Sequence, residues 1–266
     1  VLLNEKLLRI NEMLLTPGPT PVPEFARKAM SDITIHHRTP EFEAIFEKTR
    51  NLLLELYGMP EVLMLASSGT GAMEACITNL TKQKALTINS GKFGERFGKI
   101  CNAFDIEYTE IKKEWNTPVT VEEVVNTIKN DSSIDAIFIQ ICESAGGLRH
   151  PVEEIATEVK KINPNIMIIA DGITAVGVEK VDTTNIDALI SGSQKALMLP
   201  PGLAFIGLGE RVFIFLTKNI SNKIEGHDTV CYSYWLHHGA YAAVRFKKKF
   251  SARAVARCHG YDLYAT

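Results

Sequence analysis

Short, continuous apolar runs separated by amphipathic segments constrain this fold most. A strand that reads as a continuous apolar run is buried on both faces, because a half-exposed strand would alternate apolar and polar residues. Such strands alternating with helices are typical of a largely parallel sheet covered by helices on both faces. We expect strands over residues 62–66, 84–89, 106–111, 136–141, 166–170, 186–190 and 204–208.

The segments between these runs carry helix signals. The strongest is 41–57, whose apolar residues recur three and four positions apart and which ends before Gly58. Another is 120–129, where Thr120 and Glu123 have the spacing of a capping box. Further helices are expected over 24–30, 96–103 and 151–162, and from the Ser67–Glu74 turn through Leu80. The sequence therefore predicts a three-layer α/β/α fold.

The composition is that of an ordinary globular protein. The chain has 266 residues, of which 45% are hydrophobic and 23% charged, and its net charge of −2 gives no reason to expect nucleic acid or an anionic membrane as a partner. No apolar run approaches the roughly 18 residues of a membrane span, and no signal peptide is evident. The scattered cysteines form no CxxC pair, and His36 and His37 lack a ligand pattern, so neither a metal nor a disulfide framework is expected. We expect a cytoplasmic protein.

A turn rich in glycine and serine follows the first expected strand. At the start of a helix, the free N–H groups of the turn Ser67–Glu74 could bind a phosphate. The turn has neither the lysine of a P-loop nor the third glycine of a dinucleotide fingerprint. A single phosphomonoester fits better than a nucleotide, and a plain helix cap is the alternative.

A lysine follows the expected strand 186–190. Lys195 comes after the small residues Ser191-Gly192-Ser193, and Pro200-Pro201-Gly202 closes the segment. Burial at a strand end disfavours the ammonium form, so the amine becomes a nucleophile that can form Schiff bases with carbonyls. An ordinary surface lysine is the alternative.

Other residues suited to chemistry also follow strands. Phe93, Ser144 and Asp171 each stand after an expected strand, as do Lys195 and the turn Ser68–Gly71. Ligands of parallel sheets bind at the carboxyl ends of the strands. One site is a simpler explanation of this convergence than a series of coincidences.

The motifs that meet at this edge resemble those of a known family. They are Leu15–Thr20, Ser67–Glu74, Ala170–Ile173, Ser191–Leu197 and Pro200–Gly202. Together they are similar to the class V pyridoxal-phosphate aminotransferases, and most similar to the alanine–glyoxylate and serine–glyoxylate branch. The resemblance covers about residues 13–210 and implies the large domain of a fold type I enzyme.

The resemblance assigns a role to each residue around the cofactor ring. Lys195 matches the lysine that holds pyridoxal phosphate as a Schiff base. Asp171 matches the carboxylate paired with the pyridine nitrogen, and Phe93 matches the aromatic residue stacked on the ring. Ile173 would pack on the opposite face of the ring, and Ser144 matches a hydroxyl near it.

The resemblance also assigns the phosphate and substrate contacts. Ser68, Gly69 and Thr70 match the phosphate cradle, and Gln194 matches a further phosphate contact. Gly18 lies in the motif that lines the substrate pocket. The implied reaction is transamination between a small amino acid (alanine, serine or aspartate) and a 2-oxo acid such as glyoxylate or pyruvate.

The family's relatives are homodimers with the active site at the interface. We therefore expect a two-fold homodimer formed mainly by residues 1–60 and the loops that bear Phe93 and Lys195. The proline-rich segment Pro17–Pro23 must be extended and stiff, which suits reaching across an interface, although a simple linker is the alternative.

The expected organisation has three parts. Residues 1–23 form an N-terminal arm and substrate-pocket segment, 24–211 the cofactor-binding domain, and 212–266 an atypical tail in place of the family's small domain. A basic, aromatic stretch at 245–253 could suggest a nucleic-acid surface, but an altered reading frame explains it better and no nucleic-acid partner is expected.

Two other functions remain open from the sequence. Without the family's small domain, the chain could be a catalytically impaired remnant that binds the cofactor. A cysteine desulfurase or lyase of the same fold is the other alternative. Those enzymes resemble a pattern with histidine before the Schiff-base lysine and histidine on the ring, where this chain has Gln194 and Phe93.

Overall fold

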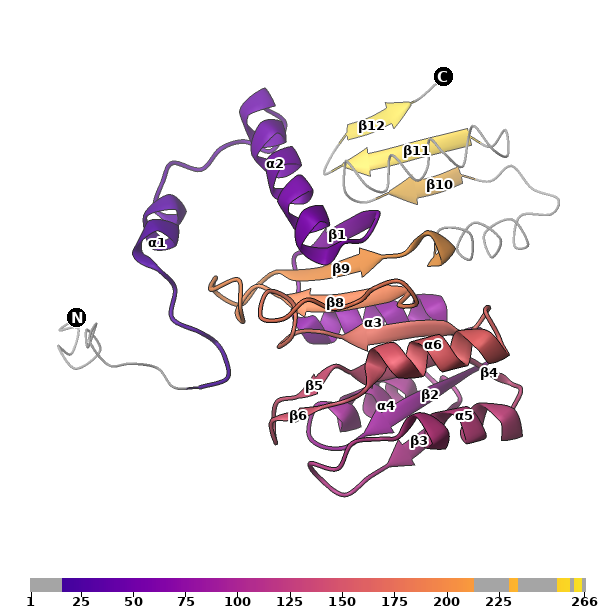
Figure 1. The fold of residues 1–266 in the computed structure, drawn as a ribbon. Coiled ribbons are helices and arrows are strands. Elements are labelled where there is room, and N and C mark those ends of the chain that lie inside the picture. Colours follow the sequence, from indigo (N-terminus) through magenta and orange to yellow (C-terminus); the bar gives the residue numbers. More distant parts are fainter. Residues whose placement is uncertain (1–15, 213–229, 234–252, 259–260, 265–266) are drawn as a thin grey trace. The chain divides into compact units, whose positions relative to one another are not determined.

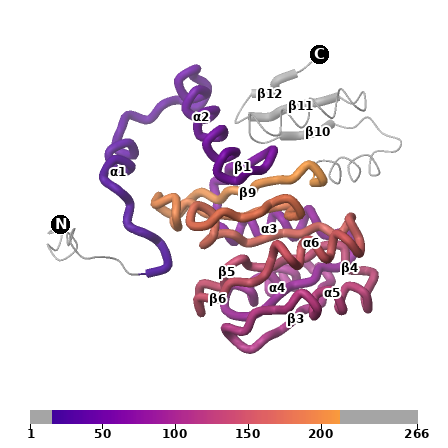
Figure 2. The backbone as a smooth tube through the Cα atoms, viewed as in Figure 1, coloured from indigo at the N-terminus to yellow at the C-terminus, as the bar shows by residue number. Residues whose placement is uncertain are grey.

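The structure is a computed structural model, which describes residues 16–212, 230–233, 253–258 and 261–264. The chain divides into two compact units, and the boundary between them in the sequence falls between Gly209 and Glu210. Each unit is described by itself. Figure 2 follows the backbone of the described residues from Thr16 to Val212.

A seven-stranded sheet forms the centre of the first unit (Figure 1). Its strands are β1 (Glu61–Leu65), β2 (Lys84–Asn89), β3 (Tyr108–Lys112), β4 (Ile134–Gln140), β7 (Met167–Asp171), β8 (Ala188–Gly192) and β9 (Ala204–Leu208). Their order across the sheet is β1-β9-β8-β7-β4-β2-β3. Only β9 is antiparallel to its neighbours β8 and β1 in this sheet. The prediction of a mostly parallel sheet is confirmed.

Six helices accompany the sheet in the described part of this unit. They are α1 (Glu24–Met30), α2 (Pro40–Tyr57), α3 (Gly69–Leu80), α4 (Gly94–Ala103), α5 (Val121–Asn130) and α6 (Val152–Ile162). Helices α3 and α4 pack on one face of the sheet, and α5 and α6 lie together on the other (Figure 1). The chain thus has the expected three layers.

The helix ends follow the signals in the sequence. Thr120 and Glu123 form both hydrogen bonds of a capping box at the start of α5. The hydroxyl of Thr39 accepts the N–H of Phe42 at 3.3 Å and caps α2. Gly58 ends α2 in the left-handed conformation, with φ of 60°, which a glycine adopts without steric cost.

The core lies between the sheet and its two helical layers. Strands β7, β8 and β9 are buried along their full length, as a continuous apolar run predicts. The rings of Phe97 on α4 and Phe138 on β4 pack with their centroids 5.4 Å apart. Burial on both faces fixes where each strand ends, and therefore where the residues that follow it lie.

Two features of the sheet region were not predicted. A hairpin of β5 (Cys142–Glu143) and β6 (Leu148–Arg149) follows β4, in a segment for which no element was predicted. Two-residue strands are too short to show a periodic pattern. Strand β9 is antiparallel because its connection to β8 holds no helix, and a parallel return needs a crossover, usually helical.

The second unit has three strands in its described residues. They are β10 (Val230–Ser233), β11 (Arg253–Cys258) and β12 (Tyr261–Tyr264), with β11 parallel to β10 and antiparallel to β12. Most of the basic stretch 245–253 lies outside the described residues. None of the helices in the described ranges combines the length and apolar character needed to cross a bilayer.

Candidate functional site

Lys195 lies on the turn that follows β8, with its side chain half-buried. Its Nζ donates a hydrogen bond to the carbonyl oxygen of Pro17 at 3.1 Å. A Cβ at Gly18 would lie 2.6 Å from Nζ, so a larger residue there would force the flexible end of the lysine side chain to shift. Burial lowers the pKa of Lys195, and the charge of Asp171 opposes this shift. The result is an amine closer to its nucleophilic, uncharged form.

Thr20 binds the segment 16–20 to the turn that carries Lys195. Its N–H donates to the carbonyl oxygen of Gln194 at 3.1 Å. Its hydroxyl donates to the carbonyl oxygen of Lys195 at 2.8 Å. These bonds hold Pro17 and Gly18 against the amine.

Asp171 is the last residue of β7, the strand next to β8. Its side chain is buried, and the carboxylate accepts the N–H of Ile173 at 3.0 Å. Burial raises the pKa of Asp171 to about 6. The Ile173 N–H and the charges of Arg96 and Lys195 oppose this shift, while the charge of Glu143 adds to it. A buried carboxylate of this kind is suited to a cationic partner.

The turn before α3 leaves the first N–H groups of a twelve-residue helix available. Ser68 caps the helix, and its hydroxyl accepts the N–H of Gly71 at 3.4 Å. A Cβ at Gly69 would lie 2.2 Å from Cδ1 of Ile173, so the turn and the Ile173 side chain are in close contact. The hydroxyl of Thr70 accepts a hydrogen bond from Nη1 of Arg96 at 2.9 Å.

Phe93 precedes the first residue of α4 and is fixed on several sides. Its N–H donates to Oε2 of Glu143 at 2.9 Å, and its carbonyl oxygen accepts from Nε2 of Gln140 at 3.1 Å. The guanidinium of Arg96 lies 5.0 Å from the centre of its ring. A ring held in this way presents a defined surface for stacking.

The structure thus places the predicted residues in contacting groups. Ile173 contacts Gly69, Phe93 and Thr70 share Arg96, and Gly18 lies on Lys195. Within the described residues, no hydrogen bond joins the side chain of Gln194 or Ser144 to another of the predicted residues. The side chain of Gln194 lies against Gly192, where a Cβ would be 2.8 Å from its Oε1. Ser144 is half-buried and makes no side-chain hydrogen bond within the described residues.

Arg96, Glu143 and Thr20 also contact these residues, and the sequence did not predict a role for them. Arg96 stands three positions after Phe93 at the start of a helix, a spacing that brings side chains together. Glu143 is a charged residue that directly follows a buried strand region, which is an unusual position for a carboxylate. Thr20 gives no signal of its own, because its partners lie 174 and 175 positions away.

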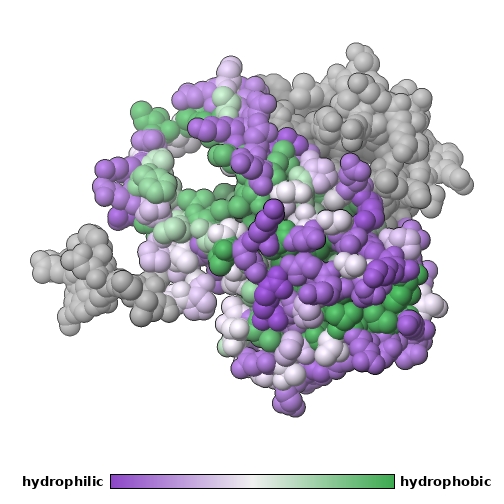
Figure 3. Space-filling model, viewed as in Figure 1, coloured by the Kyte–Doolittle hydropathy of each residue, from purple (hydrophilic) through white to green (hydrophobic). Residues whose placement is uncertain are grey.

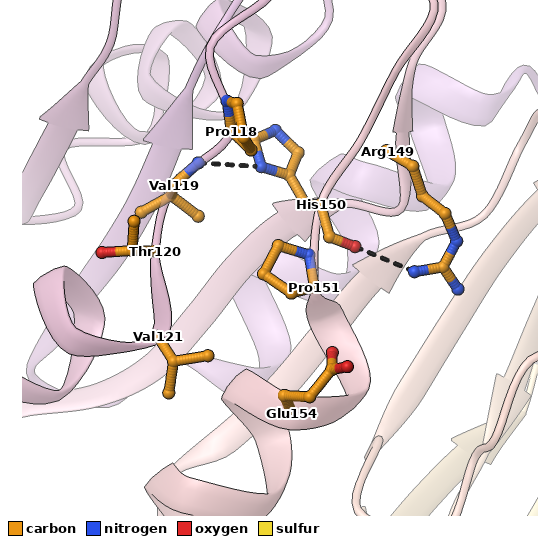
Figure 4. A pocket seen from close by; sticks show the side chains of 8 residues that line it. All are labelled: Pro118, Val119, Thr120, Val121, Arg149, His150, Pro151 and Glu154. Carbon is orange, nitrogen blue, oxygen red and sulfur yellow. Dashed lines mark hydrogen bonds between the residues drawn. The ribbon is translucent and has the colours of Figure 1, made fainter.

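A separate hollow lies where α5 and α6 begin, and it carries no comparable chemistry (Figure 4). Pro118, Val121, His150 and Glu154 are among its lining residues. The N–H of Val119 donates to Nδ1 of His150 at 3.2 Å, and burial lowers the pKa of His150 to about 4. The histidine is therefore uncharged near neutral pH.

The strand-end arrangement suits a planar, phosphorylated carbonyl compound. The N-terminus of α3 could hold a phosphate, and the ring of Phe93 could hold a flat ring. The Lys195 amine could react with a carbonyl, and buried Asp171 could pair with a cationic ring nitrogen. These residues fit pyridoxal phosphate.

Comparisons with known proteins agree with this chemistry. A model of the family described as aminotransferase class-V matches residues 23–249. An uncharacterized aminotransferase of Helicobacter pylori is 51% identical over 75% of this chain and 54% of its own length. The serine–glyoxylate aminotransferase of Hyphomicrobium methylovorum is 28% identical over 77% of this chain and 52% of its own.

The solved structures give the same result for the fold. An aspartate aminotransferase of subgroup IV from Thermus thermophilus superposes with a TM-score of 0.72 and 32% identity, covering 77% of this chain and 59% of its own. The chain spans about half the length of the curated relatives it matches.

Proposed function

Because this chain belongs to the class V aminotransferase family, as its sequence motifs predicted, we propose that it transfers an amino group between a small amino acid and a 2-oxo acid. The amino acid would be alanine, serine or aspartate, and the oxo acid glyoxylate or pyruvate. The family is one of pyridoxal-phosphate-dependent transferases, and we propose that this chain binds that cofactor.

The observation that carries the proposal is the environment of Lys195. Burial lowers the pKa of its amine, and the Pro17 carbonyl oxygen holds the amine at the strand end. When bound, pyridoxal phosphate draws electrons away from the substrate Cα, which makes the Cα proton easier to remove. Before the substrate binds, Lys195 Nζ would be attached to the cofactor. Once the substrate has displaced it, the free amine of Lys195 would carry the Cα proton.

The other residues would bind and orient. The Asp171 carboxylate would keep a proton on the pyridine nitrogen. Phe93 and Ile173 would enclose the ring, and the N-terminus of α3 at Ser68, Gly69 and Thr70 would hold the phosphate. Gln194 and Ser144 are proposed as additional contacts, and Gly18 as part of the substrate pocket.

A homodimer is proposed from the apolar surface of α1 and α2. The exposed large apolar residues of this region are Phe25, Met30, Ile33, Ile45, Leu52 and Leu56. Ile33 is 91% exposed and Phe25 78%, and Figure 3 shows apolar surface over this part of the molecule. Large exposed apolar surfaces are uncommon on monomers. Sedimentation of cofactor-loaded protein would test the dimer, and a monomer at all concentrations would contradict it.

The experiment that tests the function is an amino-transfer assay on cofactor-loaded protein. Protein with bound pyridoxal phosphate should be yellow, and added alanine, serine or aspartate should bleach the colour. Glyoxylate or pyruvate should restore it, with the matching amino acid as product. Binding of the cofactor without any bleaching would leave a chain that binds but does not transfer, and would contradict the proposed activity.

A further inference from the structure

Glu143 is a fully buried carboxylate on β5, beside the candidate site. Its Oε2 accepts the N–H of Phe93 at 2.9 Å and the N–H of Gly94 at 2.8 Å. Its Oε1 accepts the N–H of Ala145 at 3.1 Å. Within the described residues no lysine or arginine forms an ion pair with it. Backbone N–H groups and the start of α4 therefore stabilise its charge.

This carboxylate joins two loops that are far apart in sequence. One oxygen binds the loop between β2 and α4, which carries Phe93, some fifty positions before Glu143. The other binds the loop that follows Glu143 and carries Ser144 and Ala145. A Cβ at Gly91 would lie 2.6 Å from Cγ of Glu143, so glycine at 91 is what allows this close approach.

Phe93 is the residue most constrained by these contacts. Glu143 fixes its N–H, Gln140 its carbonyl oxygen and Arg96 its ring. The two backbone bonds fix the direction of the Cα–Cβ bond of Phe93, and the Arg96 guanidinium lies over its ring. Burying a carboxylate without a cationic partner lowers the stability of the fold. Stability alone therefore does not explain why Glu143 is buried at this position.

We propose that Glu143 is a positioning residue that fixes Phe93 as the stacking surface for the cofactor ring. The proposal rests on the proposed function, because it assigns Phe93 to the ring of pyridoxal phosphate. The role requires a carboxylate. In glutamine, an NH₂ group would replace one oxygen and would face a backbone N–H, whichever way the amide is turned.

The test is a pair of substitutions, Glu143→Gln and Phe93→Ala, alone and combined. The measurements are the dissociation constant of pyridoxal phosphate, the visible circular dichroism of the bound cofactor and thermal unfolding of the apoprotein. Loss of a hydrogen bond to a charged group predicts roughly 10- to 100-fold weaker binding for Glu143→Gln. The visible circular dichroism should fall, because the ring is no longer held in one orientation.

The combined variant separates positioning from a general structural role. If Glu143 acts through Phe93, Glu143→Gln should add little to the loss caused by Phe93→Ala. Glu61→Gln is the matched control, because Glu61 is also a buried carboxylate but is bound by Arg50 and the Val62 N–H on β1. It should leave the dissociation constant and the circular dichroism unchanged.

Each outcome decides the proposal. Unchanged affinity in Glu143→Gln, or losses that multiply in the combined variant, would overturn it while leaving the proposed function in place. Wild-type protein that does not bind pyridoxal phosphate would overturn both. If Glu143→Gln does not fold, Glu143→Asp keeps the charge but is too short to bind both loops. Wild-type affinity and circular dichroism in Glu143→Asp would then overturn the proposal.

Discussion

The amine of Lys195 donates a hydrogen bond to the carbonyl oxygen of Pro17 across 178 positions of sequence. This contact makes the N-terminal proline segment part of the candidate site. The neighbouring Gly18 lies so close to the lysine that a Cβ would be 2.6 Å from both Nζ and Cδ. Its φ of 153° also favours glycine.

The first prediction concerns Gly18→Ala. The added methyl group should push the flexible end of Lys195 out of place, and a misplacement of about 1 Å can lower a rate roughly 100-fold. Amino transfer should fall by at least about tenfold, while backbone strain costs about 1–3 kcal/mol of stability. Steady-state kinetics and thermal unfolding of the variant would measure the two effects.

Gly202→Ala is the matched control for this prediction. Gly202 has a similar φ of 146°, but a Cβ there would meet no atom within 4 Å. Gly202→Ala should therefore lower stability by a similar amount but leave the rate of amino transfer unchanged. Equal losses of activity in both variants would mean that strain, and not contact with Lys195, explains the effect.

A second prediction concerns pH and Asp171. Its folded pKa of about 6 lies above the ordinary value of 3.8, so the folded apoprotein holds the proton more tightly than the unfolded chain. The contribution of this group to stability is therefore fully present below about pH 4 and is lost as pH rises to about 6. A shift of this size corresponds to a loss on the order of 3 kcal/mol.

Asp171→Asn removes this titration. The free energy of unfolding of the apo variant, measured with denaturant, should therefore not fall in this way between about pH 4 and 6. The variant should still bind pyridoxal phosphate but lose most of its activity, because an amide cannot hold the proton on the ring nitrogen as a carboxylate does. Near-normal turnover by Asp171→Asn would refute the assigned role.

A third prediction concerns Arg96. Arg96→Gln removes both the hydrogen bond to Thr70 and the cation over Phe93. Together these contacts predict roughly tenfold weaker binding of pyridoxal phosphate. Lys99→Gln is the control, since Lys99 lies on the same helix but pairs with Glu95 on the surface. A titration in which both variants bind alike would contradict a role for Arg96 in the site.

The sheet and the meeting of its strand ends could be predicted from sequence because they depend on local patterns. Buried strands appear in the sequence as apolar runs, and the spacing of Thr120 and Glu123 predicts the capping box at the start of α5. Lys195 and Asp171 could be placed at one edge since each follows such a run. The direction of β9 was missed because it depends on the connection from β8, not on the strand's own residues.

The contacts that fix the site could not be predicted in the same way. Glu143 binds Phe93 from 50 positions away, and Arg96 binds Thr70 from 26. Neither pair consists of residues a few positions apart on one helix or strand, so no periodic pattern in the sequence indicates the contact. Such contacts arise only when the sheet brings the loops after its strands together.

The proposed function depends on the attachment of pyridoxal phosphate to Lys195. Borohydride reduction of cofactor-saturated protein, followed by peptide mapping, measures it directly. We expect the phosphopyridoxyl mass on the peptide that contains Lys195, and its loss in Lys195→Ala. A label on another lysine, or no label in saturated protein, would contradict the claim.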